Sequence, residues 1–206
     1  MNNEKEIINR CRKEDSNAQK EIFEKYSPIM MGVCMRYLKD KHVASDIMQE
    51  GFIVVFTKIS QYKGLGSFEG WIKRIMINLS LRYLKIKAKT HFYDIDELDK
   101  YADLQANSGE QNIDFNDKKS VITNTEISQN DIFNAVAELP DGFRTVFNLY
   151  VMEGYKHKEI AKELGISINT SKTQLLRARK QLQDKLYLIA IKKQKQKNIK
   201  FYKEVI

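Results

Sequence analysis

The stretch from Lys156 to Leu182, KHKEIAKELGISINTSKTQLLRARKQL, restricts the folds open to this chain more than any other segment. Its pattern predicts two helices that turn at Gly165, because glycine readily adopts the left-handed conformation that follows a helix. Ala161 is small where the two helices would cross closely. Aliphatic side chains are spaced to pack the pair together: Ile160, Leu164, Ile166 and Leu175. The stretch therefore predicts a helix-turn-helix.

The second of these helices is predicted to have an open N-terminus, which Ser167 or Asn169 would cap. Such a helix end fits the major groove of DNA, where Lys, Arg and Gln side chains bond to base edges. The polar and basic surface of this helix comprises Asn169, Thr170, Lys172, Thr173, Gln174, Arg177, Arg179 and Lys180. The alternative is an ordinary amphipathic helical hairpin with a solvated basic face.

The rest of the chain is also helical in pattern. Only 2 of the 206 residues are Pro and 9 are Gly, while 42% are hydrophobic, so the composition favours a folded, helical chain. Helical periodicity covers residues 1–92 and 128–188. A polar acidic stretch at 93–127 separates these blocks, and a basic tail follows at 189–206. We predict an all-α protein of two helical domains joined by a flexible acidic linker.

Charge is distributed unevenly along the chain. Residues 94–131 hold three Lys against seven Asp and three Glu, a net charge of −7, so the remaining residues must carry +15 to reach the overall +8. A basic surplus indicates a polyanionic partner, either nucleic acid or an acidic membrane surface. A basic globular protein without such a partner is the alternative.

Capping and breaking residues divide the two blocks into helices. In the first block, Asp15 or Ser16 would cap one helix, and two more are predicted at 42–62 and 67–87, separated at Gly64 and Gly66. In the second block, one helix stops at Pro140 and the next ends near residue 154. The longest helix is predicted from about residue 169, and the tail beyond 188 is either a helical extension or frayed.

Residues 139–182 are similar to region 4 of sigma factors of the extracytoplasmic-function (ECF) type, most of all those of Bacteroidetes type. The matching positions are Leu139-Pro140, Arg144, Val146-Phe147, Glu153-Gly154-Tyr155, Glu159-Ile160-Ala161 and Arg177-Ala178-Arg179. Ser171 departs from the pattern, because the family usually buries Val or Ile there. In the first block, Asp46, Gln49, Glu50 and Phe52 match the region 2 pattern D-x-x-Q-E-x-F, and residues 67–89 resemble regions 2.3–2.4.

The resemblance implies partners for both blocks. Asp46, Gln49, Glu50 and Phe52 would bind the clamp helices of the largest subunit of core RNA polymerase, and the family also contacts the polymerase flap. The first three residues lie at i, i+3 and i+4, so they share one helix face. Without the resemblance, the same patch would be interpreted as a solvated polar face. Many members of the family are held by an anti-sigma factor.

For promoter DNA, the resemblance implies two sets of contacts. The loop 62–67 would hold a base flipped out of the −10 element. The −10 set comprises Tyr62, Lys63, Gly64, Ser67, Arg74, Asn78, Arg82 and Lys85. The −35 set comprises Arg144, Asn169, Thr170, Lys172, Thr173, Leu176, Arg177 and Lys180. Phe68 and Trp71 are interpreted as core residues.

The resemblance implies no enzymatic activity, cofactor, metal or small-molecule substrate. The three His residues form no triad or metal pattern, and Cys11 and Cys34 lack CxxC spacing. Without a signal peptide or a membrane-spanning run, we expect the chain in the cytoplasm. A stand-alone helix-turn-helix regulator is one alternative function, an enzyme such as a nuclease is another, and membrane-surface binding by the Lys-rich tail is a third.

Overall fold

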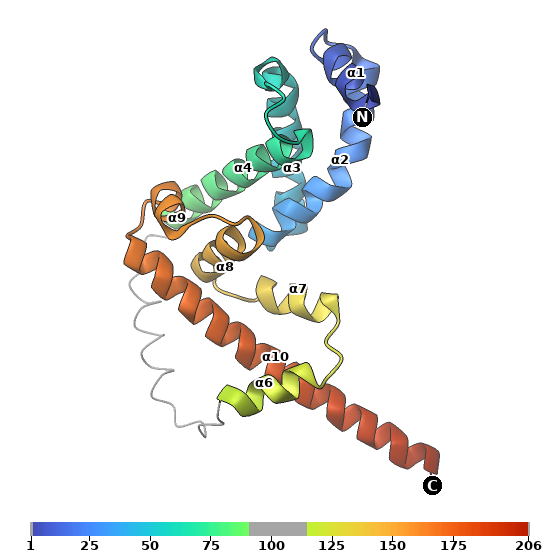
Figure 1. The fold of residues 1–206 in the computed structure, drawn as a ribbon, viewed down its shortest axis with the longest axis vertical. Coiled ribbons are helices and arrows are strands. Elements are labelled where there is room, and N and C mark those ends of the chain that lie inside the picture. Colours follow the sequence, from blue (N-terminus) through green and yellow to red (C-terminus); the bar gives the residue numbers. More distant parts are fainter. Residues whose placement is uncertain (1, 91–114, 206) are drawn as a thin grey trace. The chain divides into compact units, whose positions relative to one another are not determined.

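The computed structural model describes residues 2–90 and 115–205, which form helices and turns without a strand among them. The chain divides into two units, residues 1–92 and 93–206 (Figure 1). The all-α prediction is confirmed. Most of the predicted linker, including a short helical turn expected at 95–104, lies outside the described residues. None of the helices in the two described ranges combines the length and apolar character needed to cross a bilayer.

The N-terminal unit is built from four α-helices. These are α1 (Asn2–Cys11), α2 (Ser16–Tyr37), α3 (Lys41–Lys58), which a 3-10 turn at Ile59–Gln61 extends, and α4 (Phe68–Thr90). Helices α2, α3 and α4 pack against one another, and α1 lies on α2. Of the two capping candidates for α2, Asp15 caps it, since its carboxylate accepts hydrogen bonds from the backbone of residues 17 and 18.

Helices α3 and α4 approach closely in the core of this unit. Phe52 and Val55 of α3 are buried with Ile72 and Met76 of α4. Gly51 lies at the crossing, where an added Cβ would come within 2.2 Å of the Met76 sulfur. The absence of a side chain at Gly51 therefore lets α4 pack directly against α3.

Both cysteines are free thiols buried in this unit. Burial raises the pKa of Cys11 above its ordinary value, and it raises the pKa of Cys34 to about 11. Because the thiolate is the reactive form of cysteine, both side chains are unreactive at neutral pH. They contribute to the protein as small apolar groups.

The C-terminal unit is organised along one long helix, α10 (Ile168–Val205). The other elements are α6 (Phe115–Thr123), α7 (Gln129–Ala137), α8 (Asp141–Phe147), a π-helical turn (Asn148–Met152) and α9 (His157–Leu164). Helices α6, α7, α8 and α9 all contact α10 (Figure 1). The α10 helix thus forms the spine of this unit.

Residues 115–123 differ from the sequence prediction, because they form α6 inside the predicted linker. The basic tail takes the first of its two predicted forms, a helical extension, since α10 continues as far as residue 205. The two segments support each other. Lys118 of α6 forms a 2.7 Å ion pair with Asp184, and Gln194 donates to the Thr125 hydroxyl at 2.9 Å. A helix this short depends on tertiary contacts, which its local sequence pattern does not reveal.

Candidate polymerase and nucleic-acid interfaces

Helices α9 and α10 form the predicted helix-turn-helix. Gly165 follows α9 in the left-handed conformation, with φ 73° and ψ 31°, and its N–H donates to the Ala161 carbonyl. The Ser167 hydroxyl then caps α10 by accepting from the backbone N–H of Thr170 at 2.9 Å. Ile160 and Ala161 of α9 are buried, as are Leu175 and Ala178 of α10. The apolar residues predicted to join the pair are thus largely in place.

The first turns of α10 present a polar face to solvent. Its exposed residues recur at three- and four-residue spacing and therefore share one side of the helix. They are Asn169, Lys172, Thr173, Leu176 and Lys180, with Thr170 exposed beside them. Leu176 is 69% exposed although it is apolar. Arg177 is half-buried at the edge of this face.

Ser171 is buried on the opposite side of α10, where it has a specific partner. Its hydroxyl lies 2.9 Å from Nδ1 of His157, the first residue of α9. The His157 ring stacks on the Tyr150 ring, with the two centroids 4.7 Å apart. The Arg179 guanidinium lies over the Tyr150 ring, 5.7 Å from its centroid. The departure from the family pattern at Ser171 therefore creates a polar contact between α9 and α10.

Exposed basic and polar side chains also line α4. They lie three or four residues apart, which places them on one side of the helix: Arg74, Asn78, Arg82 and Lys85. Arg82 forms an ion pair with Glu50 of α3. One member of the expected DNA-binding set is thus in direct contact with one member of the expected polymerase-binding set.

The loop before α4 has a defined geometry. Gly64 and Gly66 adopt positive φ values of 75° and 90°, which residues other than glycine rarely adopt. The Tyr62 hydroxyl donates to the Gly66 carbonyl at 2.8 Å and so closes the loop on itself. The Ser67 hydroxyl accepts from the Gly70 N–H at 3.1 Å and thereby fixes the start of α4. Lys63 and Leu65 are exposed on this loop.

An aromatic cluster lies at the base of the loop. The Tyr62 ring is 5.1 Å from that of Phe68 and 5.5 Å from that of Trp71, measured between centroids. Phe68 is buried and also contacts Tyr26 of α2 at 5.8 Å. Phe68 is a core residue as expected, while Trp71 is half-buried.

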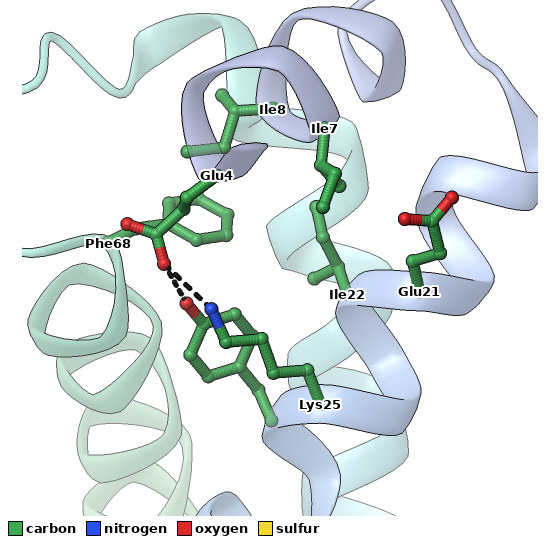
Figure 2. Close-up of a pocket in the computed structure, with 8 residues that line it drawn as sticks. Glu4, Ile7, Ile8, Glu21, Ile22, Lys25 and Phe68 are labelled. Carbon is green, nitrogen blue, oxygen red and sulfur yellow. Dashed lines mark hydrogen bonds and ion pairs between the residues drawn. The ribbon is translucent and has the colours of Figure 1, made fainter. Parts of the chain in front are cut away.

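A small pocket lies beside this cluster (Figure 2). Within it, the Glu4 carboxylate accepts hydrogen bonds from the Tyr26 hydroxyl and from Lys25, the latter at 3.0 Å. The Tyr26 bond and then the Lys25 bond hold the pKa of Glu4 below its ordinary value. The lining residues are Glu4, Ile7, Ile8, Glu21, Ile22, Lys25, Tyr26 and Phe68.

Two family models match the chain over these same elements. The model of sigma-70 region 2 matches residues 22–90, and the model of sigma-70 region 4 matches residues 129–182. The chain belongs to the sigma-70 family. Together the two matches cover most of α2, all of α3 and α4, and the elements from α7 to the first half of α10.

Relatives of this sigma factor are of the ECF type. It is 28% identical over 187 residues to the ECF RNA polymerase sigma factor SigW of Bacillus subtilis. That match covers 88% of this chain and 96% of SigW. It is 23% identical to the ECF RNA polymerase sigma-E factor of Haemophilus influenzae, over 87% of this chain and 93% of that protein. The chain is therefore an ECF sigma factor, a protein of transcription initiation.

Solved structures of sigma factors also match this chain. The sigma factor RpoE of Bartonella quintana, in a co-crystal structure with the anti-sigma factor NepR, matches with a TM-score of 0.46 and 17% identity. The match covers 81% of this chain and 95% of that chain.

Two predicted site residues of this sigma factor are buried. Phe52 is only 2% exposed, and its ring meets Phe23 of α2 edge-on at 4.8 Å, so it packs in the core. Arg144 is 1% exposed; it donates to the Leu139 carbonyl at 2.8 Å and pairs with Asp141 at 2.8 Å. These contacts fix the turn between α7 and α8.

Two exposed apolar residues were absent from the expected sites of this sigma factor. Ile53 is 67% exposed and lies seven residues after Asp46 and four after Gln49, on the same side of α3. Helical spacing alone could have identified it. Leu65 is 86% exposed on the loop between two left-handed glycines. The residues described in the structure contain no group of His, Cys, Asp and Glu suited to holding a metal ion.

Proposed function

We propose that this sigma factor directs core RNA polymerase to promoters through three surfaces. The exposed face of α3 with Asp46, Gln49 and Glu50 binds the clamp helices. The loop 62–67 and α4 read and melt the −10 element, and α10 reads the −35 element. The observation that carries the proposal is the exposed polar face of α10 at the start of a helix-turn-helix, in a chain whose other unit belongs to sigma-70 region 2.

At the −35 element, the N-terminal turns of α10 enter the major groove. Lys172 and Arg177 donate to guanine acceptors, Thr173 bonds to a base edge, and Leu176 contacts a thymine methyl group. The exposed positions of Asn169, Thr170 and Lys180 suit phosphate contacts, which fix the register of the helix on DNA. An exposed leucine on an otherwise polar face supports an apolar contact with a base.

At the −10 element, the loop holds an unpaired base above the aromatic cluster. Extruding a base from the stack costs a few kcal/mol, which stacking on aromatic side chains and hydrogen bonds to the base edge can offset. Tyr62, Lys63, Gly64 and Ser67 contribute to this pocket. The stripe of Arg74, Asn78, Arg82 and Lys85 follows the strand, its cations pairing with phosphates.

The finer assignments follow from this role. We infer a region 2 domain at 1–92, a linker beginning at 93, a region 4 domain at 128–188 and a basic tail at 189–206. The acidic linker occupies a basic nucleic-acid channel of polymerase and is displaced by RNA. The chain is of the Bacteroidetes-like subgroup, works in the cytoplasm, contacts the flap and has an anti-sigma partner. It needs no catalytic residue or cofactor, because polymerase supplies the chemistry.

The test is run-off transcription with core RNA polymerase and a pool of genomic promoter fragments, with and without this protein. New transcript starts that share two spaced motifs are the expected result. Specific DNA binding that persists without polymerase, combined with no new starts, would instead identify a free-standing helix-turn-helix regulator.

A further inference from the structure

Helix α1 lies outside the matched region 2 segment but contacts the loop that precedes α4. Arg12, directly after α1, donates from Nη2 to the Tyr62 carbonyl at 2.6 Å, and from Nη1 to the Asn9 side chain at 3.0 Å. Fifty positions separate Arg12 from Tyr62. One guanidinium thus ties the C-terminal end of α1 to the first residue of the loop.

This hydrogen bond acts at the first residue of the loop, whose ring packs on Phe68 and Trp71 and whose N–H donates to the Ile59 carbonyl. The other end is fixed by the Ser67 cap and by the burial of Phe68 in the core. Between these ends lie Gly64 and Gly66, and glycine loses more conformational freedom on ordering than any other residue. Ordering such a segment costs conformational entropy, so a contact that fixes its first carbonyl restricts the whole loop.

Helix α1 also reaches the loop through a series of side-chain contacts. Glu4 accepts a hydrogen bond from the Tyr26 hydroxyl (Figure 2). The Tyr26 ring contacts Phe68, and the Phe68 ring contacts Tyr62. Ile8 of α1 is buried beside them and lines the same pocket. Two separate routes of contact therefore lead from α1 to Tyr62.

We propose that α1 sets the geometry of the −10 loop, with Arg12 as a positioning residue that determines which unpaired base the loop accepts. The inference rests on the proposed function of the loop. Arg12 acts through the Tyr62 carbonyl and needs no contact with DNA. Its planar guanidinium reaches the two acceptors from two separate nitrogens in a fixed fork, a geometry that the flexible side chain of lysine, with one nitrogen, does not match.

The experiment compares Arg12→Ala and Arg12→Lys with Lys13→Ala, which removes a neighbouring exposed cation for which no contact to the loop is seen. Amide hydrogen exchange of residues 63–66 in the full chain reports loop order. Run-off transcription on promoters with every base at each −10 and −35 position reports selectivity. Both Arg12 variants should exchange faster and show a several-fold weaker −10 preference, with the −35 preference unchanged. Lys13→Ala should match the unsubstituted protein in both readouts.

An unchanged −10 preference in Arg12→Ala would overturn the inference. Full activity and selectivity of Arg12→Lys, with loss only in Arg12→Ala, would overturn it too and indicate a phosphate contact that needs only charge. Failure of the unsubstituted protein to initiate with core polymerase would overturn the proposed function first, and the unsubstituted reaction in each series separates the two failures.

Discussion

The guanidinium of Arg82 on α4 forms an ion pair with the carboxylate of Glu50 on α3. The close crossing at Gly51 brings the two helices near enough for this contact. We propose that Glu50 binds polymerase and that Arg82 binds −10 DNA. In the free protein, each of the two side chains is therefore already paired with the other instead of with its proposed partner. A polymerase group that binds Glu50 would release Arg82 for the DNA backbone.

The pair predicts that Glu50→Gln increases the affinity of the free protein for single-stranded DNA. Both side chains are substantially exposed, at 60% and 42%, and such a pair contributes about 0.2–1 kcal/mol, so the gain should be at most a few-fold. Fluorescence anisotropy with a labelled oligonucleotide measures it. The same gain from Glu50→Gln in an Arg82→Gln background would show a general charge effect and contradict the coupling.

The burial of Arg144 predicts a structural phenotype. Arg144→Ala should lower the free energy of unfolding by about 2–3 kcal/mol, because carbonyls that accept a charged donor would be left without it. Urea denaturation measures this loss, and Lys172→Ala on the exposed face of α10 should stay within about 0.5 kcal/mol. A phosphate-binding role would instead leave stability intact and reduce the salt slope of DNA binding by about one.

The contact between Asp131 and Lys193 predicts a pH dependence. The Lys193 hydrogen bond, followed by those of Ser128, lowers the pKa of Asp131 from 3.8 to about 2. Because the folded pKa lies below the unfolded one, the stabilisation is fully present above the unfolded pKa and is lost as the pH falls through the folded pKa. The melting temperature of Asp131→Asn should therefore lie below that of the unsubstituted protein at neutral pH.

This difference in melting temperature should shrink between about pH 4 and about pH 2, where Asp131 becomes protonated. Thermal unfolding followed by circular dichroism checks it. Glu126→Gln is the matched control, since Lys193 contacts only the backbone carbonyl of that residue. A difference that is constant with pH would mean that the charge of Asp131 is not involved.

The face of α10 predicts a sequence-specific defect. Lys172→Ala and Arg177→Ala should each cost about 1–3 kcal/mol of discrimination between −35 sequences if they bond to bases. Competition binding with −35 variants in the presence of core polymerase measures it. Lys162→Ala removes an exposed cation from α9 and serves as the control. Equal weakening at every −35 sequence would assign both residues to phosphates.

The elements that local sequence specifies were predictable. Gly165 and the apolar register of α9 and α10 are local signals, and they gave the helix-turn-helix before any tertiary information. Phe52 shows the limit of motif matching. Its position four residues after Met48 and three before Val55 places it on the buried side of α3, so periodicity indicates a core residue where the motif alone suggested a contact with polymerase.

The features that were missed depend on distant parts of the chain. Arg12 meets Tyr62 across fifty positions, and α6 is stabilised by residues more than sixty positions later. No local pattern encodes such pairings, because each member alone resembles a solvated polar residue.

The packing of α6 and α7 on the far part of α10 also orders events during synthesis. Residues 2–90 already contain every helix of the N-terminal unit, whereas α6 and α7 need Asp184, Lys193 and Gln194. At about 5–20 residues per second, the roughly 100 intervening residues take about 5–20 s to emerge from the ribosome. The nascent chain would thus fold its N-terminal unit first, and a chain that ends before Lys193 would carry that unit with an incompletely packed C-terminal unit.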